Sequence, residues 1–460
     1  MKVMKFGGSS VADGPKIAHV VELVRKARER EPVAVVLSAM KGVTDLLLSM
    51  ARKAESGDPS YREDLSSLTA RQKETLSSLM GDGTQAGAAW DAVSALLEDL
   101  SSILHGIELV RECSRRSLDL VASFGERLNC TLVTRYLLSL GERAEYVDAR
   151  EVVLTDDSFG SAVVQFEETY GRIRERLAGD AIYVVTGFIG ATREGVTTTL
   201  GRNGSDYSAA IVGAGVGAEE VEIWTDVDGV MSADPRVVPE AFVLEEVSFQ
   251  EAMELSYFGA KVIHPYTMIP AVERDIPIVI KNTMNPGFPG TRIVKHPKPH
   301  PWPITGIASI PGVALINIEG SGMMGVPGIA ARVFSALAEA KVNIIMISQA
   351  SSEHSICVVC RKEEVDRALD ALERSLEPER RARIISDFEC IRDLEIIAIV
   401  GENMRGTPGL AGRLFQAVGE RGINVHAIAQ GSSERNLSFV VDEERGQEAV
   451  RVIHKAFFGR

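Results

Sequence analysis

The stretch TTTLGRNGSDYSAAIVGAG, Thr197 to Gly215, passes from a small polar segment with two nearby glycines to a small apolar segment with helical spacing. This change predicts a helix capped by Ser205, with Asp206 as its first residue. A helix start beside glycine presents free backbone N–H groups and the positive end of the helix dipole, which suits an anionic ligand. Arg202 adds a planar fork for a carboxylate or a phosphate. Taken alone, a capped helix beside a surface arginine is the simpler interpretation.

The composition is that of a folded, acidic protein. The 460 residues allow about three domains, and 45% hydrophobic residues with a mean hydropathy of +0.05 are enough to bury full cores. The formal net charge of −14 argues against nucleic-acid and anionic-membrane partners, because phosphate binding needs a basic field. No apolar run has the length needed to span a bilayer.

The N-terminus and the cysteines indicate a cytoplasmic protein. The opening MKVMKFGGSS breaks at two glycines and does not resemble a signal peptide. The five cysteines are an odd number. Cys357 and Cys360 have CxxC spacing but lie in a strand-like segment, and no second pair completes a zinc site. We therefore expect buried thiols, no metal held by protein side chains, and a cytoplasmic location.

A second anion site is predicted near the N-terminus. Val3 to Phe6 is predicted to be a strand, GGSS to be a loop, and Pro32 to Leu37 to be a buried parallel strand beyond a helix. In such a βαβ unit the loop lies at the carboxyl end of the first strand, where open α/β sheets bind ligands. Lys5 stands beside this loop, so a cation and backbone N–H groups converge where a phosphate could lie. The loop lacks the Walker A pattern, and a strand-end Gly-Gly is also common in ordinary turns.

Further predicted strands end in polar or glycine-rich segments. Pro32 to Leu37 leads into SAMKGVTD, which contributes the hydroxyls of Ser38 and Thr44. Residues 181–186 lead into GFIG, and residues 221–225 end at Asp226. The alternation of such strands with helical segments predicts an α/β domain with a mainly parallel sheet.

Residues 46–140 have a helical pattern almost throughout, with breaks at SGDPS (56–60) and MGDGTQAG (80–87). Inside this insertion, SFGER places Glu126 directly after a glycine. The carboxylate has an equally simple explanation as a solvated or capping group. His264, in IHPYT, is also more simply structural than functional.

The last third of the chain contains an internal repeat. GSGMMGVPG (320–328) recurs as GENMRGTPG (401–409), and QASSE (349–353) recurs with the same offset as QGSSE (430–434). Each copy predicts strand, Gly-rich turn, helix, strand, strand and helix, which is a βαββαβ module. GSGMMG also fits a dinucleotide-binding pattern, but no acid ends the next strand and the second copy loses the middle glycine. A nicotinamide-dependent enzyme is therefore the weaker alternative.

Seven motifs, in this order, resemble those of aspartate kinases of the amino-acid-kinase family: KFGGSSV, SAMKGVTD, SFGER, TGFIG, TTTLGRNGSDYSAA, EIWTDVDGV with DPR, and FGAKVIHP. The repeat is similar to the tandem ACT regulatory domains of such enzymes, so the resemblance covers nearly the whole chain. It implies a three-layer kinase domain with a helical insertion at 1–296, a proline-rich linker at 297–306, and α+β ACT domains at 307–380 and 388–460.

The resemblance also implies phosphorylation of the side-chain carboxylate of L-aspartate by ATP and Mg²⁺. The product would be 4-phospho-L-aspartate, the first intermediate toward lysine, threonine and methionine. A carboxylate with a pKa of about 4 is already ionised at neutral pH, so the nucleophile needs no general base. The task is to bring an anion to a polyanion, which calls for cations and precise alignment.

By similarity, each motif supplies one role. The catalytic set would be Lys5, Asp206 and Lys261, in which Asp206 orients the two lysines that hold the phosphates. Arg202 would bind the α-carboxylate of aspartate and Glu126 its amino group, within a pocket formed by Ser38, Thr44, Glu126, Phe188, Arg202 and Ser205. ATP would contact Lys5, Gly7, Gly8, Ser9, Thr225, Asp226, Met231, Arg236 and Lys261, and its phosphates would hold most of the Mg²⁺.

Two positions depart from the family pattern. Asn203 stands where glycine is usual, and Met231 stands where an aromatic residue is common. Asparagine tolerates the left-handed backbone region better than most residues, so the loop is expected to form. The loss of a stacking ring at Met231 is expected to weaken the nucleotide contact.

ACT modules of such kinases bind an end-product amino acid at a dimer seam, so a homodimer or a larger homo-oligomer is implied. Gln349 and Gln430 match threonine-sensitive relatives, whereas Ile345 stands where lysine sensors tend to carry an acid. A buried lysine ammonium would lack its partner there, which favours threonine as the effector. The expected effector residues are Met324, Gly325, Asn343, Ile344, Gln349 and Gln430.

Two alternatives remain open. One is a kinase of the same fold that acts on another acid or on a nucleotide. The other is a catalytically silent regulator that binds amino acids through its ACT modules. Because the sequence ends at Arg460, we expect a monofunctional kinase without a fused dehydrogenase domain.

Overall fold

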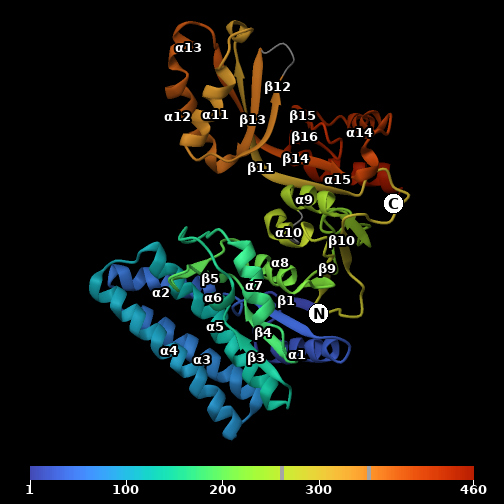
Figure 1. Ribbon diagram of the computed structural model, residues 1–460. Coiled ribbons are helices and arrows are strands. Elements are labelled where there is room, and N and C mark those ends of the chain that lie inside the picture. Colours follow the sequence, from blue (N-terminus) through green and yellow to red (C-terminus); the bar gives the residue numbers. More distant parts are fainter. Residues whose placement is uncertain (260–263, 350–353, 460) are drawn as a thin grey trace. The chain divides into compact units, whose positions relative to one another are not determined.

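The computed structural model, drawn in Figure 1, describes residues 1–259, 264–349 and 354–459. The chain forms two compact units. Of the described residues, unit 1 contains 1–230, 245–249 and 264–297, and unit 2 contains 231–244, 250–259, 298–349 and 354–459. Two segments from the middle of the chain therefore belong with the C-terminal repeat.

Unit 1 is built on an eight-stranded sheet with the order β3-β4-β2-β1-β7-β9-β10-β8. The strands from β3 to β9 in this order pair in parallel, and β10 is antiparallel to β9. The apolar runs of the sequence thus form the buried centre of a mainly parallel sheet. The strands are β1 (Lys2–Phe6), β2 (Val33–Leu37), β3 (Ala144–Val147), β4 (Ile182–Thr186), β7 (Glu220–Thr225), β8 (Glu246–Ser248), β9 (Ile278–Asn282) and β10 (Thr291–Val294), with a separate hairpin of β5 (Ile189–Ala191) and β6 (Thr197–Thr199).

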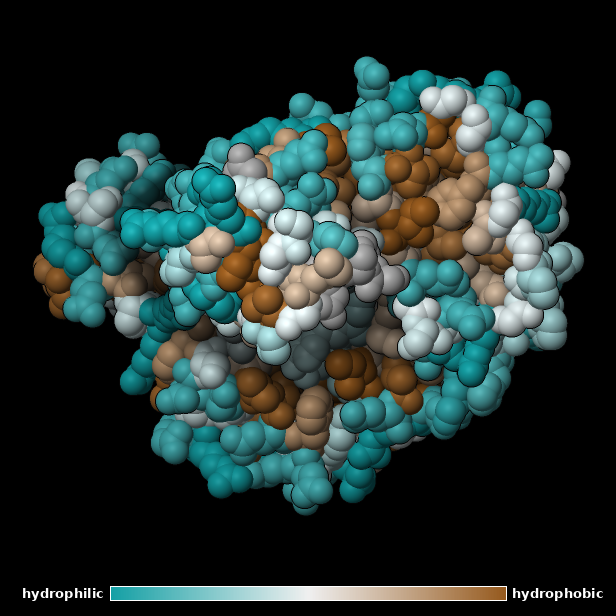
Figure 2. All heavy atoms as spheres, turned by 90° about the horizontal axis from the view of Figure 1, so that it is seen from above, coloured by the Kyte–Doolittle hydropathy of each residue, from teal (hydrophilic) through white to brown (hydrophobic). Residues whose placement is uncertain are grey.

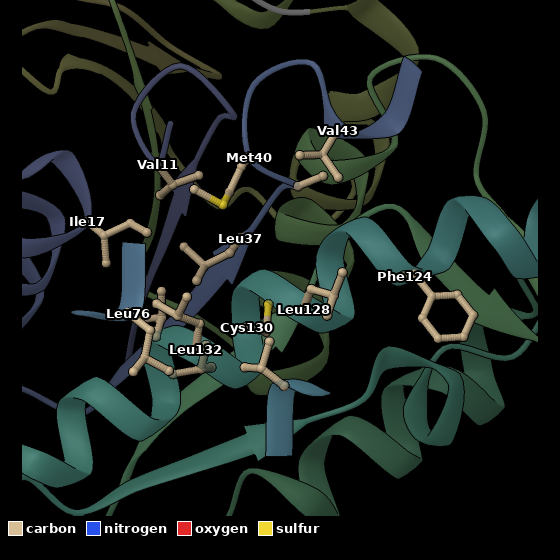
Figure 3. Close-up of a cluster of buried hydrophobic side chains, with 14 of the residues drawn as sticks. Val11, Ile17, Leu37, Met40, Val43, Leu76, Phe124, Leu128, Cys130 and Leu132 are labelled. Carbon is tan, nitrogen blue, oxygen red and sulfur yellow. The ribbon is translucent and has the colours of Figure 1, made fainter. Parts of the chain in front are cut away.

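Helices cover both faces of this sheet. Met4 and Phe6 of β1 lie in the core formed with α1 to α5, so Lys5 between them points to the opposite face, where α8 lies. Figure 3 shows part of that core, in which Leu37 of β2 lies near Cys130 of α5. The helices are α1 (Gly14–Arg28), α2 (Val43–Ser56), α3 (Tyr61–Met80), α4 (Thr84–Val110), α5 (Arg115–Ser139), α6 (Ala149–Val152), α7 (Phe166–Arg176), α8 (Gly204–Val216) and α10 (Pro265–Val272).

The helical insertion has one more break than the sequence analysis predicts. The two expected breaks separate α2 from α3 and α3 from α4. The third lies between α4 and α5, where Arg111 adopts a left-handed backbone conformation (φ 56°). Ser114 then caps α5 by accepting a hydrogen bond from the Ser117 backbone N–H at 3.2 Å. The serine in this position is the local signal that the sequence analysis did not use.

The start of α8 differs from the prediction. Its N-cap is Asn203 and its first residue is Gly204, so the prediction that Ser205 caps the helix is wrong by two residues. Asn203 adopts the left-handed conformation expected for it (φ 57°, ψ 24°). Its carbonyl accepts from the N–H of Asp206 at 3.0 Å, and Gly204 N–H donates to Gly201 O, also at 3.0 Å. This tight turn starts the helix before the serine is reached.

Unit 2 is built on a six-stranded antiparallel sheet with the order β12-β13-β11-β14-β16-β15. Its strands are β11 (Gly306–Glu319), β12 (Ile344–Gln349), β13 (Ser355–Arg361), β14 (Asp387–Val400), β15 (Ala427–Gln430) and β16 (Asn436–Asp442). Its helices in the repeat are α11 (Ile329–Glu339), α12 (Val365–Ser375), α13 (Glu377–Arg381), α14 (Leu410–Gly419) and α15 (Glu443–Phe458). The predicted fold class, a mainly parallel α/β domain followed by two α+β modules, is confirmed. No helix among the described residues combines the length and apolarity needed to cross a membrane.

The two repeat modules share their central strands. The first part of β11 (306–310) pairs with β14 and contributes Ile307 to the core of the second module. After an irregularity at Gly312 (φ 67°), the second part of β11 pairs with both β13 and β14 and contributes Ile316 to the core of the first module. Each module is therefore completed by a strand segment that continues into the other.

The two outer strands of this sheet carry exposed hydrophobic side chains. Ile347 on β12 and Ile428 on β15 are 48% and 44% exposed. The hydroxyl of Ser348 donates to the carbonyl of Ile428 at 2.8 Å, so β12 and β15 meet. The face of the molecule seen in Figure 2 carries hydrophobic patches between hydrophilic side chains. Exposed apolar side chains on strands are typical of surfaces that pair with another chain.

Candidate active site

The carboxyl ends of β1, β2 and β4 meet at one edge of the sheet, because these strands are parallel neighbours. The segments that follow them, together with α5, the loop before α8 and the first turn of α8, line an open cavity of about 370 Å³. Open α/β sheets bind ligands at this edge. The predicted residues that line the cavity are Lys5, Gly7, Gly8, Ser38, Thr44, Glu126, Phe188, Arg202, Ser205 and Asp206.

Lys5 and Asp206 form an ion pair at the centre of this set. Lys5 Nζ lies 2.6 Å from Asp206 Oδ1, and the two side chains are 11% and 13% exposed. The alternation of β1 turns Lys5 toward α8, and the first turn of α8 holds Asp206 in place. A lysine fixed in this way at a helix N-terminus is a ready-made site for a phosphate oxygen.

The two glycines after β1 allow the backbone to come close to its neighbours. A Cβ atom on Gly8 would lie 2.7 Å from the carbonyl oxygen of Ala39, which no real side chain permits. A Cβ atom on Gly7 would lie 3.4 Å from Lys5 Nζ, which is close to an ordinary van der Waals contact. Ser9 is exposed and does not line the cavity.

Glu126 is the buried carboxylate of the cavity. It is 3% exposed and its Oε1 accepts a hydrogen bond from the backbone N–H of Ala39 at 3.1 Å. Its Oε2 is buried without a hydrogen-bond partner among the described residues. Burial raises the pKa of Glu126 to about 8, although the Ala39 N–H opposes the shift. A carboxylate kept out of water with one free oxygen is suited to a cationic group of a ligand.

The loop before α8 is anchored by a residue that the sequence analysis missed. Asp119, buried on α5, accepts hydrogen bonds at 2.9 Å from both the N–H and the hydroxyl of Thr199, which lies on β6 just before Arg202. Burial raises the pKa of Asp119, while these bonds lower it. Arg202 itself is exposed at the cavity. No local motif marks Asp119, because its partner is far away in the sequence.

A third cation lines the cavity besides the predicted Lys5 and Arg202. Lys41, in SAMKGVTD, is exposed and lies on the loop between β2 and α2, just before the helix that contains Thr44. The guanidinium of Arg71 donates to the Lys41 carbonyl at 3.1 Å and to the Ala12 carbonyl at 2.9 Å, which ties this loop to the segment after β1. The position of a lysine in the loop that follows a strand was the available signal for it.

The other residues predicted to bind ATP are spread more widely. Thr225 ends β7 and Asp226 follows it, and the Thr225 hydroxyl donates to Asp226 at 3.2 Å, but neither residue lines the cavity. Met231 and Arg236 belong to unit 2, where Arg236 is 88% exposed and paired with Asp234 at 2.6 Å. Lys261 lies outside the described residues.

The predicted effector residues lie on the surface of unit 2. Asn343, Gln349 and Gln430 are exposed at the ends of β12 and β15, and Met324 is 54% exposed before α11. Ile344, at the start of β12, is half-buried, and Gly325 adopts a left-handed conformation (φ 67°).

Helix α9 (Phe249–Tyr257) directly precedes the FGAK motif in the sequence, and all of its residues after Phe249 belong to unit 2. Three of its side chains, spaced three residues apart and so on one helix face, hydrogen-bond to the repeat modules. The bonds are Glu402 N–H to Glu251 Oε1 at 2.8 Å, Asn436 Nδ2 to Glu254 Oε2 at 2.8 Å, and Tyr257 OH to the Ile345 carbonyl at 3.1 Å. The strand with the predicted effector residues therefore contacts the helix that precedes the FGAK motif.

Comparison with known proteins agrees with this arrangement. The amino acid kinase family matches residues 1–282, and the ACT domain matches residues 316–376 and 397–457. The chain is 39% identical over 464 residues to the bifunctional aspartokinase/homoserine dehydrogenase 2 of Arabidopsis thaliana, covering 99% of this chain and 50% of that protein. It is 35% identical to Arabidopsis aspartokinase 1, covering 99% and 80%. The chain thus spans about half the length of the bifunctional relatives that it matches.

Solved structures show the same fold. Escherichia coli aspartokinase III, crystallised with aspartate and ADP, has a TM-score of 0.81 and 29% identity, with 100% of each chain covered. The same enzyme with lysine and aspartate has a TM-score of 0.81 and 30% identity, with 100% of this chain and 99% of that chain covered. The motifs of the cavity, the tandem modules and these similarities agree, and the chain belongs to the amino acid kinase family, among the aspartokinases that carry tandem ACT domains.

Proposed function

We propose that the chain is an ATP:L-aspartate 4-phosphotransferase. The γ-phosphoryl group of ATP would pass to the side-chain carboxylate of L-aspartate, giving 4-phospho-L-aspartate and ADP. One observation carries the proposal: the Lys5–Asp206 pair and the unpaired oxygen of Glu126 line the same cavity, so groups for a phosphate and for an ammonium are present together. The complex of the E. coli relative with aspartate and ADP supports the same pair of ligands.

The proposed chemistry is positioning and charge neutralisation. The attacking carboxylate is ionised at neutral pH, so no side chain has to remove a proton. A lysine and a phosphate oxygen about 4 Å apart attract by about 4 kcal/mol at an effective dielectric near 20, which offsets part of the repulsion between the two anions. Lys5, with Lys261, would hold the phosphates as charge moves to the bridging oxygen, and Asp206 would keep Lys5 oriented.

The amino-acid end of the substrate would be bound at the other side of the cavity. Glu126 Oε2 would accept the α-ammonium group, and Arg202 would bind the α-carboxylate as a fork. Ser38, Thr44 and Phe188 would shape the pocket around the side chain of aspartate. Ser205, which lies beside Gly187, also lines the pocket.

The way in which Mg²⁺ would be bound depends on the side chains that could act as its ligands. Among the described residues, no three carboxylate, imidazole or thiol side chains lie close enough together to hold an ion. Mg²⁺ would therefore be bound mainly through the phosphates of ATP, where it neutralises charge on the transferring group.

We also propose feedback inhibition by threonine at the effector residues of unit 2. The E. coli relative was crystallised with lysine, so lysine is the direct competitor of this proposal. In this chain position 345 is an isoleucine, whose side chain offers no carboxylate to a lysine ammonium, and its carbonyl accepts from the hydroxyl of Tyr257. Exposed apolar side chains on β12 and β15 support a homodimer or a larger homo-oligomer around this site.

The reaction would open the route to lysine, threonine and methionine. All five cysteines are free thiols, which suits a reducing compartment such as the cytoplasm.

The test of activity is a hydroxamate assay with ATP, Mg²⁺ and L-aspartate, which traps the acyl phosphate. Aspartyl hydroxamate should form, and L-glutamate in place of L-aspartate should give none. If no hydroxamate forms while threonine still binds, the chain is a silent amino-acid-binding regulator instead.

The test of regulation is a titration of the same assay with threonine and with lysine. Threonine should inhibit, and Gln349→Ala should raise the half-inhibiting concentration by about tenfold or more while kcat stays nearly unchanged. Gln416→Ala, an exposed glutamine on α14, is the matched control and should leave inhibition unchanged. Inhibition by lysine alone would contradict the choice of effector.

A further inference from the structure

A groove of about 440 Å³ lies between α4, α5 and β3 in unit 1. It shares no lining residue with the active-site cavity. Ala92 and Leu96 of α4 and Ala144 of β3 give it apolar walls. Arg127, the last residue of SFGER, and Thr131 add polar side chains from α5. We call it the α4–α5 groove.

Arg127 is the unusual residue of this groove. It is 9% exposed, and its guanidinium lies over the ring of Phe124, with 4.3 Å between Cζ and the ring centroid. Its Nε is buried and has no hydrogen-bond partner among the described residues. Stacking on an aromatic face accommodates a cation but leaves its N–H groups free.

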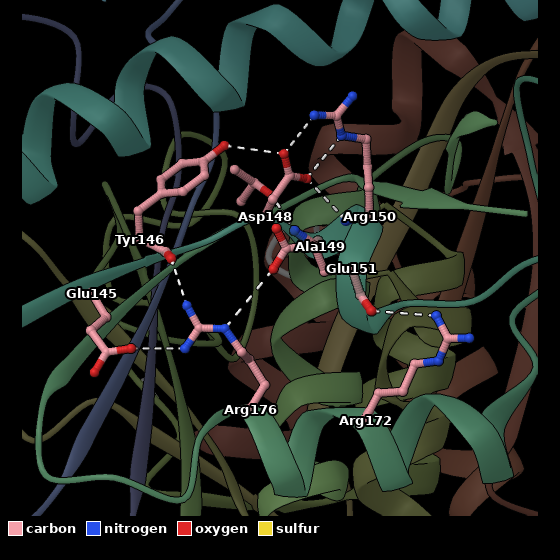
Figure 4. Close-up of polar contacts among 9 residues, drawn as sticks. Glu145, Tyr146, Asp148, Ala149, Arg150, Glu151, Arg172 and Arg176 are labelled. Carbon is pink, nitrogen blue, oxygen red and sulfur yellow. Dashed lines mark hydrogen bonds and ion pairs between the residues drawn. The ribbon is translucent and has the colours of Figure 1, made fainter. Parts of the chain in front are cut away.

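The acid next to Arg127 is already engaged by another arginine. Asp148 accepts from Arg150 Nη2 at 2.6 Å and from Arg150 Nε at 2.9 Å, and Tyr146 OH donates to it at 3.4 Å (Figure 4). The charged and titratable groups around Arg127 are Arg150, which repels the cation, and Tyr146, Asp148 and Asp99, which favour it. Burial lowers the pKa of Arg127, which reflects the cost of keeping this cation away from water.

This arrangement is costly without a ligand. A buried cation that lacks a hydrogen-bonded anion loses its solvation by water without a replacement. The chain has 64 acidic residues against 50 basic ones, so an excess of acids was available to pair with it. On the same face of α5, Arg127, Thr131 and Arg135 follow at intervals of four residues, each step about 6 Å, so donors line the groove along its length.

We propose that the α4–α5 groove binds a small amphipathic oxyanion, with a carboxylate or phosphate head at Arg127 and Thr131 and an apolar body against Ala92 and Leu96. The volume is in the range of small-molecule sites, in which apolar walls and a few fixed polar groups are the rule. This site is separate from the proposed kinase reaction and does not depend on it.

The test uses three probes on the full chain. Inorganic phosphate has the anionic head group and no apolar part, whereas phenyl phosphate and 4-methylpentanoate join an apolar group to a phosphate and to a carboxylate. Binding is measured by calorimetry and by the shift in Tm, and a crystal soaked with the tightest probe locates it. One of the two amphipathic probes should bind at least about tenfold more tightly than inorganic phosphate, and which of them does so identifies the head group. Arg127→Met should weaken that binding by at least about tenfold.

Arg116→Met, an exposed arginine on the same helix, is the control and should bind like the wild type. Without ligand, Arg127→Met should have an unchanged or higher Tm, because replacing an unpaired buried cation by a side chain of similar volume removes a desolvation cost. Arg127→Lys should retain weak binding. The proposal would be overturned if Arg127→Met bound the probe as tightly as the wild type, or if the crystal showed the probe only outside the groove. It would also be overturned if the protein changed its oligomeric mass and showed no affinity for the anions.

Discussion

The active-site cavity and the effector residues are built in opposite ways. The cavity lies inside unit 1, and its charged residues are held by partners within that unit, as Lys5 is by Asp206 and Glu126 by Ala39. The predicted effector residues Gln349 and Gln430 stand exposed at the ends of the two outer strands of unit 2. A preorganised site is suited to chemistry, whereas exposed residues on an edge are suited to a site completed by a ligand or a second copy.

This difference predicts that substitutions in the two regions have separable effects. Changes in the cavity should alter kcat or KM and leave inhibition intact, while changes at the link between β12 and α9 should alter inhibition and leave the uninhibited rate intact. Four substitutions test this separation.

The largest effect is expected for Lys5→Met. If Lys5 faces the transferring phosphoryl group, losing its cation should lower kcat by about 10³-fold, with a much smaller change in the KM for aspartate. Lys26→Met, an exposed lysine on α1, is the control and should keep full activity. Steady-state kinetics by the hydroxamate assay measure both. A kcat within tenfold of the wild type would remove Lys5 from the catalytic set.

The contrast between Lys5 and Asp119 explains how far the sequence could predict this site. Lys5 and the glycines after it lie at the end of a strand, and the GRNGSD segment leads into a helix. Local patterns therefore place these residues at the edge of the sheet that binds ligands. Asp119 lies within a long helix and acts through Thr199, 80 positions later, so no pattern marks it. Lys41 was overlooked although it follows a strand end.

Unit 2 shows a similar limit. The repeat and its order of elements were predictable because the same motifs recur in both copies. The sharing of β11 and β14 between the modules was not predictable. It depends on pairing between strands about 80 residues apart, and the sequence of half a strand does not show which partner it pairs with. Local patterns identified the modules, but only the sheet reveals that neither module is complete alone.

The second largest effect is expected for Glu126→Gln. If Oε2 accepts the ammonium group of aspartate, losing its charge should raise the KM for aspartate by about 10²-fold with a smaller change in kcat. A bound ammonium favours the ionised form, so the wild-type KM should fall as pH rises toward 8, and the variant should lack this trend. Measuring KM from pH 6 to 8.5 checks both, and a parallel trend in the variant would exclude Glu126 from the substrate contact.

The same residue predicts a pH dependence of stability without ligand. The pKa of Glu126 is about 8 in the folded protein and about 4.3 when unfolded, so between these values the folded state holds a proton that the unfolded chain has lost. The contribution of this residue to the free energy of unfolding therefore falls as pH rises from about 5 to 8. Glu126→Gln should flatten the dependence, which urea unfolding at several pH values measures.

A smaller and different effect is expected for Tyr257→Phe. The substitution removes the hydrogen bond from α9 to the Ile345 carbonyl and keeps the ring. If this contact transmits effector binding, the half-inhibiting threonine concentration should change by about threefold while kcat without effector stays the same. Tyr136→Phe, on α5 of unit 1, is the control. A fall in the uninhibited rate of Tyr257→Phe would show that α9 supports the cavity directly and that the two regions are not separable.

The smallest effect is expected for Asn203→Gly, in the part of the cavity lining that directly precedes α8. Asn203 already adopts the left-handed conformation, and its carbonyl already starts α8, so the geometry around Arg202 and Asp206 does not need glycine. Glycine would stabilise the folded state by relieving backbone strain, and it would destabilise it by raising the conformational entropy of the unfolded chain. The two effects should cancel to within about 0.5 kcal/mol in the free energy of unfolding. Activity should equal or slightly exceed that of the wild type. A large loss of kcat would mean that the asparagine side chain itself contacts a substrate, and the loop would then belong to the chemistry rather than to its frame.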